Sequence, residues 1–218
     1  MHSYSIDKKI RVRTSIALFV FSIALSILLR TKLSTHMELV STQLTAMKLD
    51  TVIGFISSTG ILPNFLEAAV IYSIVSFIFE NCLWKCPLIR CVHRIPNLNG
   101  HWEGTLCSSF SEETIPMKLD IVQTWSDISF RSTFPKSTSS SNTAAIYIDD
   151  NRGISIYFGF HNDSNDIETG MQSYDGYNIL SLTDKDTLTA RYFNNRPNPK
   201  KSIKGGNMGT FTVTREKH

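Results

Sequence analysis

The feature that most limits how this chain can fold is a run of sixteen residues, from Thr14 to Leu29, that contains no charged side chain. Arg13 precedes the run and Arg30 follows it. Sixteen helical residues extend over about 24 Å, less than the roughly 30 Å hydrocarbon core of a bilayer. The long side chains of the flanking arginines can reach the membrane surface and make up the difference. We therefore expect a helix here that crosses a membrane.

A cleaved signal peptide is the alternative, because a charged start followed by a short apolar run is also its pattern. However, no small-x-small cleavage site follows the run, and Arg30 lies where such a site is expected. We therefore favour a helix that is retained in the protein.

A second apolar segment extends from about Leu62 to Leu83, with Pro63 in its first turn, where proline is tolerated. Trp84 follows it and suits a membrane interface. We expect a second transmembrane helix here. Glu67 either lies near the helix end at the far interface or, inside the bilayer, makes a polar contact between assembled copies.

The distribution of lysine and arginine predicts the orientation of these helices. Seven basic residues flank the outer ends of the two helices and three lie between them, so both chain ends are expected in the cytoplasm. The cysteines agree with a reducing compartment, because they form no convincing disulfide framework. Their spacing, together with His93, also matches no zinc site. No metal or other cofactor is expected. The four cysteines are Cys82, Cys86, Cys91 and Cys107.

The charge balance separates the chain into two parts. Residues 1–94 carry ten Lys/Arg and five Asp/Glu, whereas residues 95–218 carry twelve and fourteen. We interpret residues 1–94 as a two-helix membrane region with a linker and residues 95–218 as a cytoplasmic ligand-binding domain. The second part is not a generic binder of polyanions, so DNA and long RNA are not expected as partners. A small phosphate ligand needs only a few well-placed donors.

After Pro96 the apolar pattern changes to a period of two, which is typical of β-strands. The stretch Gly100-His101-Trp102-Glu103-Gly104 begins the first strand, and its glycines suit a close approach of backbones. Residues 136–142 are expected to form a solvated loop, and the alternative is that their hydroxyls, beside Lys136, donate to phosphate. We predict a membrane helical hairpin followed by an all-β domain, a small eight-stranded antiparallel up-and-down β-barrel, with a sandwich as the alternative. The later alternating segments are residues 117–125, 128–134, 144–148, 154–160, 177–183, 187–196 and 208–215.

The most informative segment for function is the one at residues 187–196. Tyr192, Asn194 and Arg196 share one face of it, and together they offer the stacking, edge hydrogen bonds and charge that a nucleotide needs. A polar outer face is the alternative interpretation. No paired nucleophile and base and no phosphate-binding loop are found in the sequence, so an enzyme is not expected.

Together these features resemble the two-transmembrane, β-strand-rich effectors of bacterial CBASS anti-phage systems (SMODS-associating membrane effectors). The resemblance covers essentially the whole chain. It is carried by the helices at 16–29 and 62–83, the strand start at 100–104, the serine-rich segment at 137–142, and Arg191-Tyr192 with Arg196.

The resemblance implies that a lipocalin-like barrel in the cytoplasm binds a cyclic dinucleotide made by a partner nucleotidyltransferase. Binding then drives the membrane helices to form homo-oligomers and to disrupt the inner membrane, which kills the infected cell. Aromatic residues are implied as stacking or wall residues, and arginines and serines as contacts to phosphates or base edges. The candidate ligand residues are Trp102, Trp125, Arg131, Ser139, Ser140, Ser141, Tyr157, Arg191, Tyr192, Asn194 and Arg196, with Glu67 as the candidate contact between helices.

The alternative function is a membrane-anchored binder of a lipid or another apolar ligand. That function predicts a barrel interior without charge, so it is favoured if Arg191 and Arg196 both point outward.

Overall fold

The computed structural model describes residues 1–45, 61–110, 114–151, 153–164, 172–196 and 206–216, with side chains up to residue 29 and again from residue 68. The chain divides into two compact units. One consists of Met1–Lys8 together with Lys85–His218, and the other of Lys9–Trp84. The first eight residues therefore belong to the same unit as the strands, rather than to the helices that follow them.

The helical unit contains most of α1 (Lys8–Thr45) and all of α3 (Ile61–Asn81). Among the described residues, one helical stretch is long and apolar enough to cross a membrane, and it is Lys8–Leu29 in α1. The apolar part of α3 that is described, Ala68–Asn81, is shorter, so the second span stays a prediction. Glu67 falls within α3, but its side chain lies outside the described residues.

A short helical connection leads from α3 to the first long strand. It contains η1 (Leu83–Lys85) and α4 (Pro87–His93). α4 begins with a proline, and the residue that follows it, Arg94, has a left-handed conformation. Proline is favourable at the first position of a helix, because an N–H at that position would have no acceptor within the helix. The His93 ring then packs edge to face on Trp125, with 5.1 Å between centroids, and its Nδ1 accepts a hydrogen bond from the Ile95 N–H.

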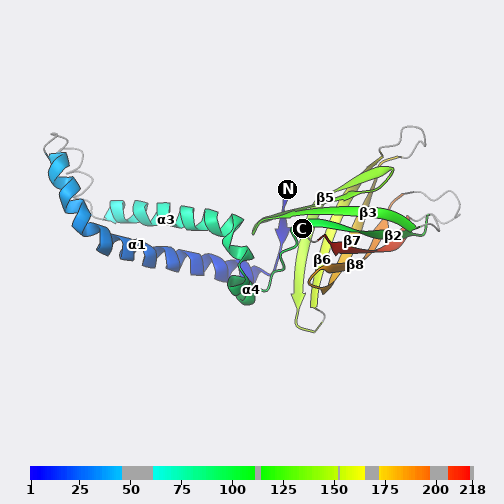
Figure 1. The fold of residues 1–218 in the computed structure, drawn as a ribbon, viewed down its shortest axis with the longest axis horizontal. Coiled ribbons are helices and arrows are strands. Elements are labelled where there is room, and N and C mark those ends of the chain that lie inside the picture. Colours follow the sequence, from blue (N-terminus) through cyan, green and yellow to red (C-terminus); the bar gives the residue numbers. More distant parts are fainter. Residues whose placement is uncertain (46–60, 111–113, 152, 165–171, 197–205, 217–218) are drawn as a thin grey trace. The chain divides into compact units, whose positions relative to one another are not determined.

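The other unit is built around one sheet, which is closed into a barrel (Figure 1). Each strand from β2 to β8 pairs antiparallel with the next, and β9 returns to pair with β2. The predicted up-and-down order of these eight strands is confirmed. The strands are β1 (His2–Ser5), β2 (Gly100–Ser108), β3 (Thr114–Gln123), β4 (Asp127–Thr133), β5 (Ser137–Asp149), β6 (Gly153–Ser164), β7 (Tyr174–Asp184), β8 (Thr187–Asn194) and β9 (Met208–Arg215).

Two features of the sheet differ from the prediction. A ninth strand, β1, lies between β4 and β5 and runs parallel to β5, so the sheet is neither eight-stranded nor wholly antiparallel. The predicted loop at residues 136–142 was also wrong, because β5 begins at Ser137. Ser137 and Ser139 are buried on the inner face. A strand with a polar inner face lacks the apolar alternation that reveals strands in a sequence.

One end of the barrel is closed by large side chains. Trp102 is fully buried there, its Nε1–H donates to the Leu98 carbonyl at 3.0 Å, and the Arg215 guanidinium lies 4.4 Å from the centre of its ring. The predicted close approach of backbones is confirmed at Gly104, where an added Cβ would lie 1.9 Å from the Thr212 carbonyl oxygen. Gly100 has a φ of 130°, which favours glycine.

Further along the barrel, two aromatic rings cross its interior. The Phe130 and Phe158 rings stack almost parallel, with 4.2 Å between centroids and an interplanar angle of 4°. Both side chains are almost completely buried. On their strands they lie between the inward residues of the two ends, Ile128 and Ser132 on β4 and Ile156 and Phe160 on β6.

The outer face carries a histidine whose charge is coupled to neighbouring carboxylates. His161 Nδ1 lies 2.8 Å from Asp175 Oδ1, and its Nε2 lies 3.4 Å from Asp163 Oδ1. The hydrogen bond to Asp175 raises the pKa of His161, while burial opposes this effect. Because the folded state holds the proton more tightly, this stabilisation is complete below the unfolded pKa and fades as pH rises through the folded pKa.

Replacing Asp175 by asparagine is therefore expected to lower the pKa of His161. The wild type should exceed this variant in thermal unfolding midpoint by more at about pH 5.5 than at about pH 9, because only protonated His161 pairs with the carboxylate. An NMR titration of His161 and unfolding midpoints across this range test the prediction. A difference in midpoint that does not change with pH would contradict it.

Candidate functional site: an open cavity at one end of the barrel

The open end of the barrel holds a cavity of about 570 Å³. This volume is within the range of about 300–1,000 Å³ that is usual for small-molecule sites. The cavity is lined by the C-terminal ends of β2, β4 and β8 and by the N-terminal ends of β3, β5, β7 and β9, with Phe160 from β6. Trp102 lies at the start of β2 and Trp125 in the turn after β3, so both are at the other end.

One side of the cavity wall is polar. The register pairs Ser132 with Ser139, Ser139 with Asn162, and Asn162 with Tyr174, so these four residues form a row across β4, β5, β6 and β7. Ser132, Ser139 and Tyr174 line the cavity directly. The row therefore presents hydroxyl groups from β4, β5 and β7 to a molecule in the cavity.

Asn162, the member of this row on β6, is hydrogen-bonded to two serine side chains. Its Nδ2 donates to Ser139 Oγ at 2.7 Å and to Ser137 Oγ at 3.2 Å. Because both serine oxygens accept these hydrogen bonds, their hydroxyl hydrogens remain available to donate to a ligand. Asn162 is 1% exposed, and its Oδ1 has no hydrogen-bond partner. The sequence does mark Asn162 as a candidate site residue. It continues the alternating series of Ile156, Phe158 and Phe160 on β6, but its side chain is polar.

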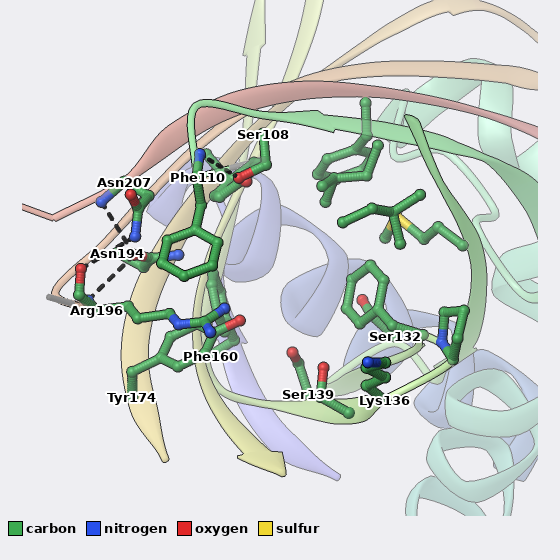
Figure 2. Close-up of a pocket in the computed structure, with 18 of the residues that line it drawn as sticks. Ser108, Phe110, Ser132, Lys136, Ser139, Phe160, Tyr174, Asn194, Arg196 and Asn207 are labelled. Carbon is green, nitrogen blue, oxygen red and sulfur yellow. Dashed lines mark hydrogen bonds between the residues drawn. The ribbon is translucent and has the colours of Figure 1, made fainter. Parts of the chain in front are cut away.

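Arg196 lies on the other side of the cavity, together with two aromatic rings (Figure 2). Its Cζ is 3.8 Å from the centre of the Phe110 ring and 5.7 Å from that of Tyr174. The backbone here is fixed by amides. Asn194 Oδ1 accepts from the Arg196 N–H at 3.1 Å, and Asn207 Nδ2 donates to the Arg196 carbonyl at 3.0 Å. The guanidinium is thus held where it can both stack and donate hydrogen bonds.

The cavity favours an anionic ligand. Among the lining residues that the structure describes, Lys136 and Arg196 carry charge and none is a carboxylate. In Figure 2 the two cations lie apart, with Lys136 near Ser132 and Ser139 and Arg196 near Phe110. Two separate cations match a ligand with two separate negative charges.

Two phenols in the wall stay protonated and act as hydrogen-bond donors. Burial raises the pKa of Tyr174, and the charge of Arg196 only partly opposes this effect. Burial likewise raises the pKa of Tyr192, against an opposing hydrogen bond with Ser108. Both phenols are therefore neutral near neutral pH, and each can donate an O–H to a phosphate or a base edge.

The remaining wall is apolar and comes from neighbouring strands. Leu106 is on β2, Ile115 and Met117 are on β3, and Phe211 is on β9. An apolar wall opposite hydroxyl groups suits a ligand that has flat rings as well as charge.

The structure brings together some of the predicted site residues and separates others. Tyr192 and Asn194 of β8 line the cavity together with Arg196, which lies two residues past the end of β8, and Ser139 joins them. Arg131, Ser140 and Arg191 are exposed on the outer face, Tyr157 lies on the face opposite Phe158, and Ser141 is bonded to His2. Trp102 and Trp125 belong to the closed end. Strand alternation explains why Arg131, Ser140, Arg191 and Tyr157 miss the cavity, because adjacent residues such as Ser139 and Ser140 face opposite ways.

Several lining residues were not singled out from the sequence. Phe110 and Asn207 lie just outside the strands, and Ser132 and Asn178 are isolated polar residues within strands, so no local pattern marks any of them as part of a site. In the described part of the chain, no group of three or more His, Cys, Asp and Glu side chains is placed to hold a metal ion.

A comparison with known protein families shows to which family this domain is related. A family model described as "Cap15, cyclic dinucleotide receptor domain" matches residues 93–215, more than half of the 218-residue chain. The chain belongs to the Cap15 family. The matched segment contains β2–β9 and every residue that lines the cavity. A search of curated proteins gives no match. The Cap15 assignment supports the CBASS resemblance and identifies the barrel as a cyclic dinucleotide receptor domain.

Proposed function

We propose that this Cap15 family member is a membrane effector that binds a cyclic dinucleotide in the open cavity of its barrel, and that it is not an enzyme. Arg196 carries the proposal, because it points into the cavity and is held between two aromatic rings. The lipid-binding alternative would be favoured if Arg191 and Arg196 both pointed outward, and Arg196 does not.

The ligand chemistry follows from the composition of the wall. A cyclic dinucleotide has two phosphates and two aromatic bases. Lys136 and Arg196 supply two positive charges, and the hydroxyls of the polar row donate to phosphate oxygens. Phe110 and Tyr174 supply ring faces for the bases.

The membrane response forms the second part of the proposal. The nucleotide comes from a partner nucleotidyltransferase during infection, and its binding leads the helices of several copies to assemble and disrupt the inner membrane. We assign the first span to Lys8–Leu29 and the second to residues 62–83, with both chain ends in the cytoplasm. Polar contacts between copies, including one through Glu67, stabilise such assemblies in lipid.

A thermal-shift experiment tests the binding step. The full chain in detergent is heated with each member of a panel of cyclic dinucleotides, and at least one is expected to raise the unfolding midpoint. Linear dinucleotides and a lysophospholipid serve as comparison ligands. Stabilisation by the lipid alone, with the barrel folded, would favour the alternative function.

A pair of adjacent serines provides a finer prediction. Ser139→Ala is expected to weaken binding of the stabilising nucleotide by roughly three- to tenfold, because one hydroxyl donor to the ligand is lost. Ser140→Ala is the matched control, since this neighbouring hydroxyl is exposed on the outer face, and its affinity should equal that of the wild type. Equal affinities for both variants, measured by calorimetry, would remove Ser139 from the site.

A further inference from the structure

The hairpin of β4 and β5 divides into two arms partway along its length. Near the cavity its strands pair at Arg131–Ser140, Ser132–Ser139 and Thr133–Thr138. Beyond Ser141 the register of β5 shifts, and β4 and β5 no longer pair with each other. Such an irregularity bends a strand and ends its pairing with a neighbour. The hairpin therefore leaves a gap on the side of the closed end.

The N-terminal strand β1 fills this gap. His2 and Ser3 pair antiparallel with Ile128 and Asp127 of β4. The next two residues, Tyr4 and Ser5, pair parallel with Ala144 and Ala145 of β5. Tyr4 is 4% exposed, and its backbone N–H donates to the Ser126 carbonyl at 3.3 Å. β1 is thus an integral part of the sheet, although 94 residues separate it from β2.

Ser141 joins β1 to both arms where they separate. Its Oγ accepts a hydrogen bond from the Phe130 N–H of β4 at 2.9 Å. The same Oγ is hydrogen-bonded to His2 Nε2 of β1 at 2.7 Å. One hydroxyl therefore connects three strands, and a change in the spacing of the arms changes its contact with β1.

The paired part of the same hairpin is also cavity wall. Ser132 lies on β4, Ser139 on β5, and Lys136 in the turn that connects them, and all three line the cavity. On the other side, β1 is followed by only Ile6 and Asp7 before α1 begins at Lys8, the first residue of the candidate membrane span.

We propose that β1 is a coupling strand, which transmits occupancy of the cavity to α1. A ligand that draws the hydroxyls and Lys136 toward itself alters the spacing of the arms, and this alters how β1 is held between them. The link between β1 and the cavity wall is a property of the sheet, whereas the identity of the ligand rests on the function proposed above.

The first experiment needs no ligand. Hydrogen–deuterium exchange is measured on the full chain in detergent for the wild type and for His2→Ala, which removes the contact with Ser141. Amides of residues 131–133 and 138–140 are expected to exchange about tenfold faster in the variant, because β1 no longer holds the arms together. The matched control is Thr189→Ala, which removes the 3.1 Å hydroxyl contact to Thr183 between β7 and β8. Unchanged exchange in the hairpin of His2→Ala would overturn the proposal.

The second experiment locks β1 in place. Ser3→Cys with Asp127→Cys allows a disulfide between directly paired residues of β1 and β4. Glu103→Cys with Lys118→Cys is the matched control, an antiparallel pair between β2 and β3 away from the gap. Both pairs are introduced into a chain whose native cysteines, Cys82, Cys86, Cys91 and Cys107, are replaced by serine.

The readouts are nucleotide binding and release of dye from liposomes made of bacterial lipids. The oxidised β1–β4 pair is expected to bind the nucleotide but to release at least tenfold less dye than its reduced form, whereas the control pair releases equally in both states. Equal release from the oxidised and reduced β1–β4 pair would overturn the coupling. A wild type that binds no cyclic dinucleotide defeats the proposed function alone, and hydrogen exchange in His2→Ala then decides the coupling.

Discussion

Replacement of Arg196 by alanine is expected to weaken cyclic dinucleotide binding by roughly 100-fold, equivalent to about 2.7 kcal/mol. The guanidinium is the positive charge that stacks on Phe110 and Tyr174 in the cavity. Its removal eliminates a charge-assisted hydrogen bond to phosphate and a stacking surface together. Calorimetry on the full chain in detergent, with the nucleotide that gives the largest thermal shift, measures the effect.

Arg191→Ala is the matched control for this prediction. Arg191 lies on β8, five residues before Arg196, and its side chain is exposed on the outer face. It is expected to leave affinity unchanged within a factor of about two. Arg196→Lys separates the two contributions of the guanidinium, because lysine keeps the charge but loses the planar donor group. Equal losses in Arg191→Ala and Arg196→Ala would indicate a general electrostatic effect rather than a contact in the cavity.

Replacement of Trp102 by alanine is expected to destabilise the barrel by about 3–5 kcal/mol, the range for a large aromatic side chain removed from a core. Trp102 is fully buried. In the variant the Leu98 carbonyl loses the indole N–H that donates to it, and Arg215 loses the ring against which it packs. Thermal and urea unfolding of the full chain in detergent, followed by β-sheet circular dichroism, measure the change.

Two comparisons separate a core role from a role in binding. Tyr147→Ala removes an aromatic side chain that is 58% exposed, and stability is expected to change by no more than about 0.5 kcal/mol. Trp102→Phe should retain most of the stability and bind nucleotide with the affinity of the wild type, because Trp102 lies at the end of the barrel away from the cavity. A large loss of affinity in folded Trp102→Phe would contradict this placement and restore Trp102 to the candidate ligand residues.

Much of the sheet is predictable from the sequence, because most inner-face residues are apolar and alternate with polar ones. Residues such as Leu119, Ile121, Ile156 and Phe158 mark their strands in this way. The first half of β5 is not predictable by this rule, since its inner residues are serines that face a cavity rather than a packed core. β1 has only four residues, too few for a periodic pattern, and its place is set by pairing with strands more than 120 residues away.

The candidate site could be predicted only where one strand contributes a whole polar face. The end of β8 and the residues just after it do so, and Tyr192, Asn194 and Arg196, which the sequence places on one face, all line the cavity. Serines adjacent in sequence were grouped together, but alternation sends Ser139 inward and Ser140 outward. Arg196 and Phe110 meet through closure of the sheet, which no local spacing in the sequence reveals. Whether an arginine or a tryptophan reaches the cavity therefore depends on the pairing register of its strand and on how close it lies to the open end of the barrel.

The stacked pair Phe130 and Phe158 packs the barrel interior one inward position deeper than Ser132 and Phe160, which line the cavity. Both rings are 1% exposed, and neither lines the cavity itself. A molecule that reaches inward along β4 and β6 therefore meets packed rings rather than further open space. Along these two strands a compact ligand is favoured over one with an extended acyl chain.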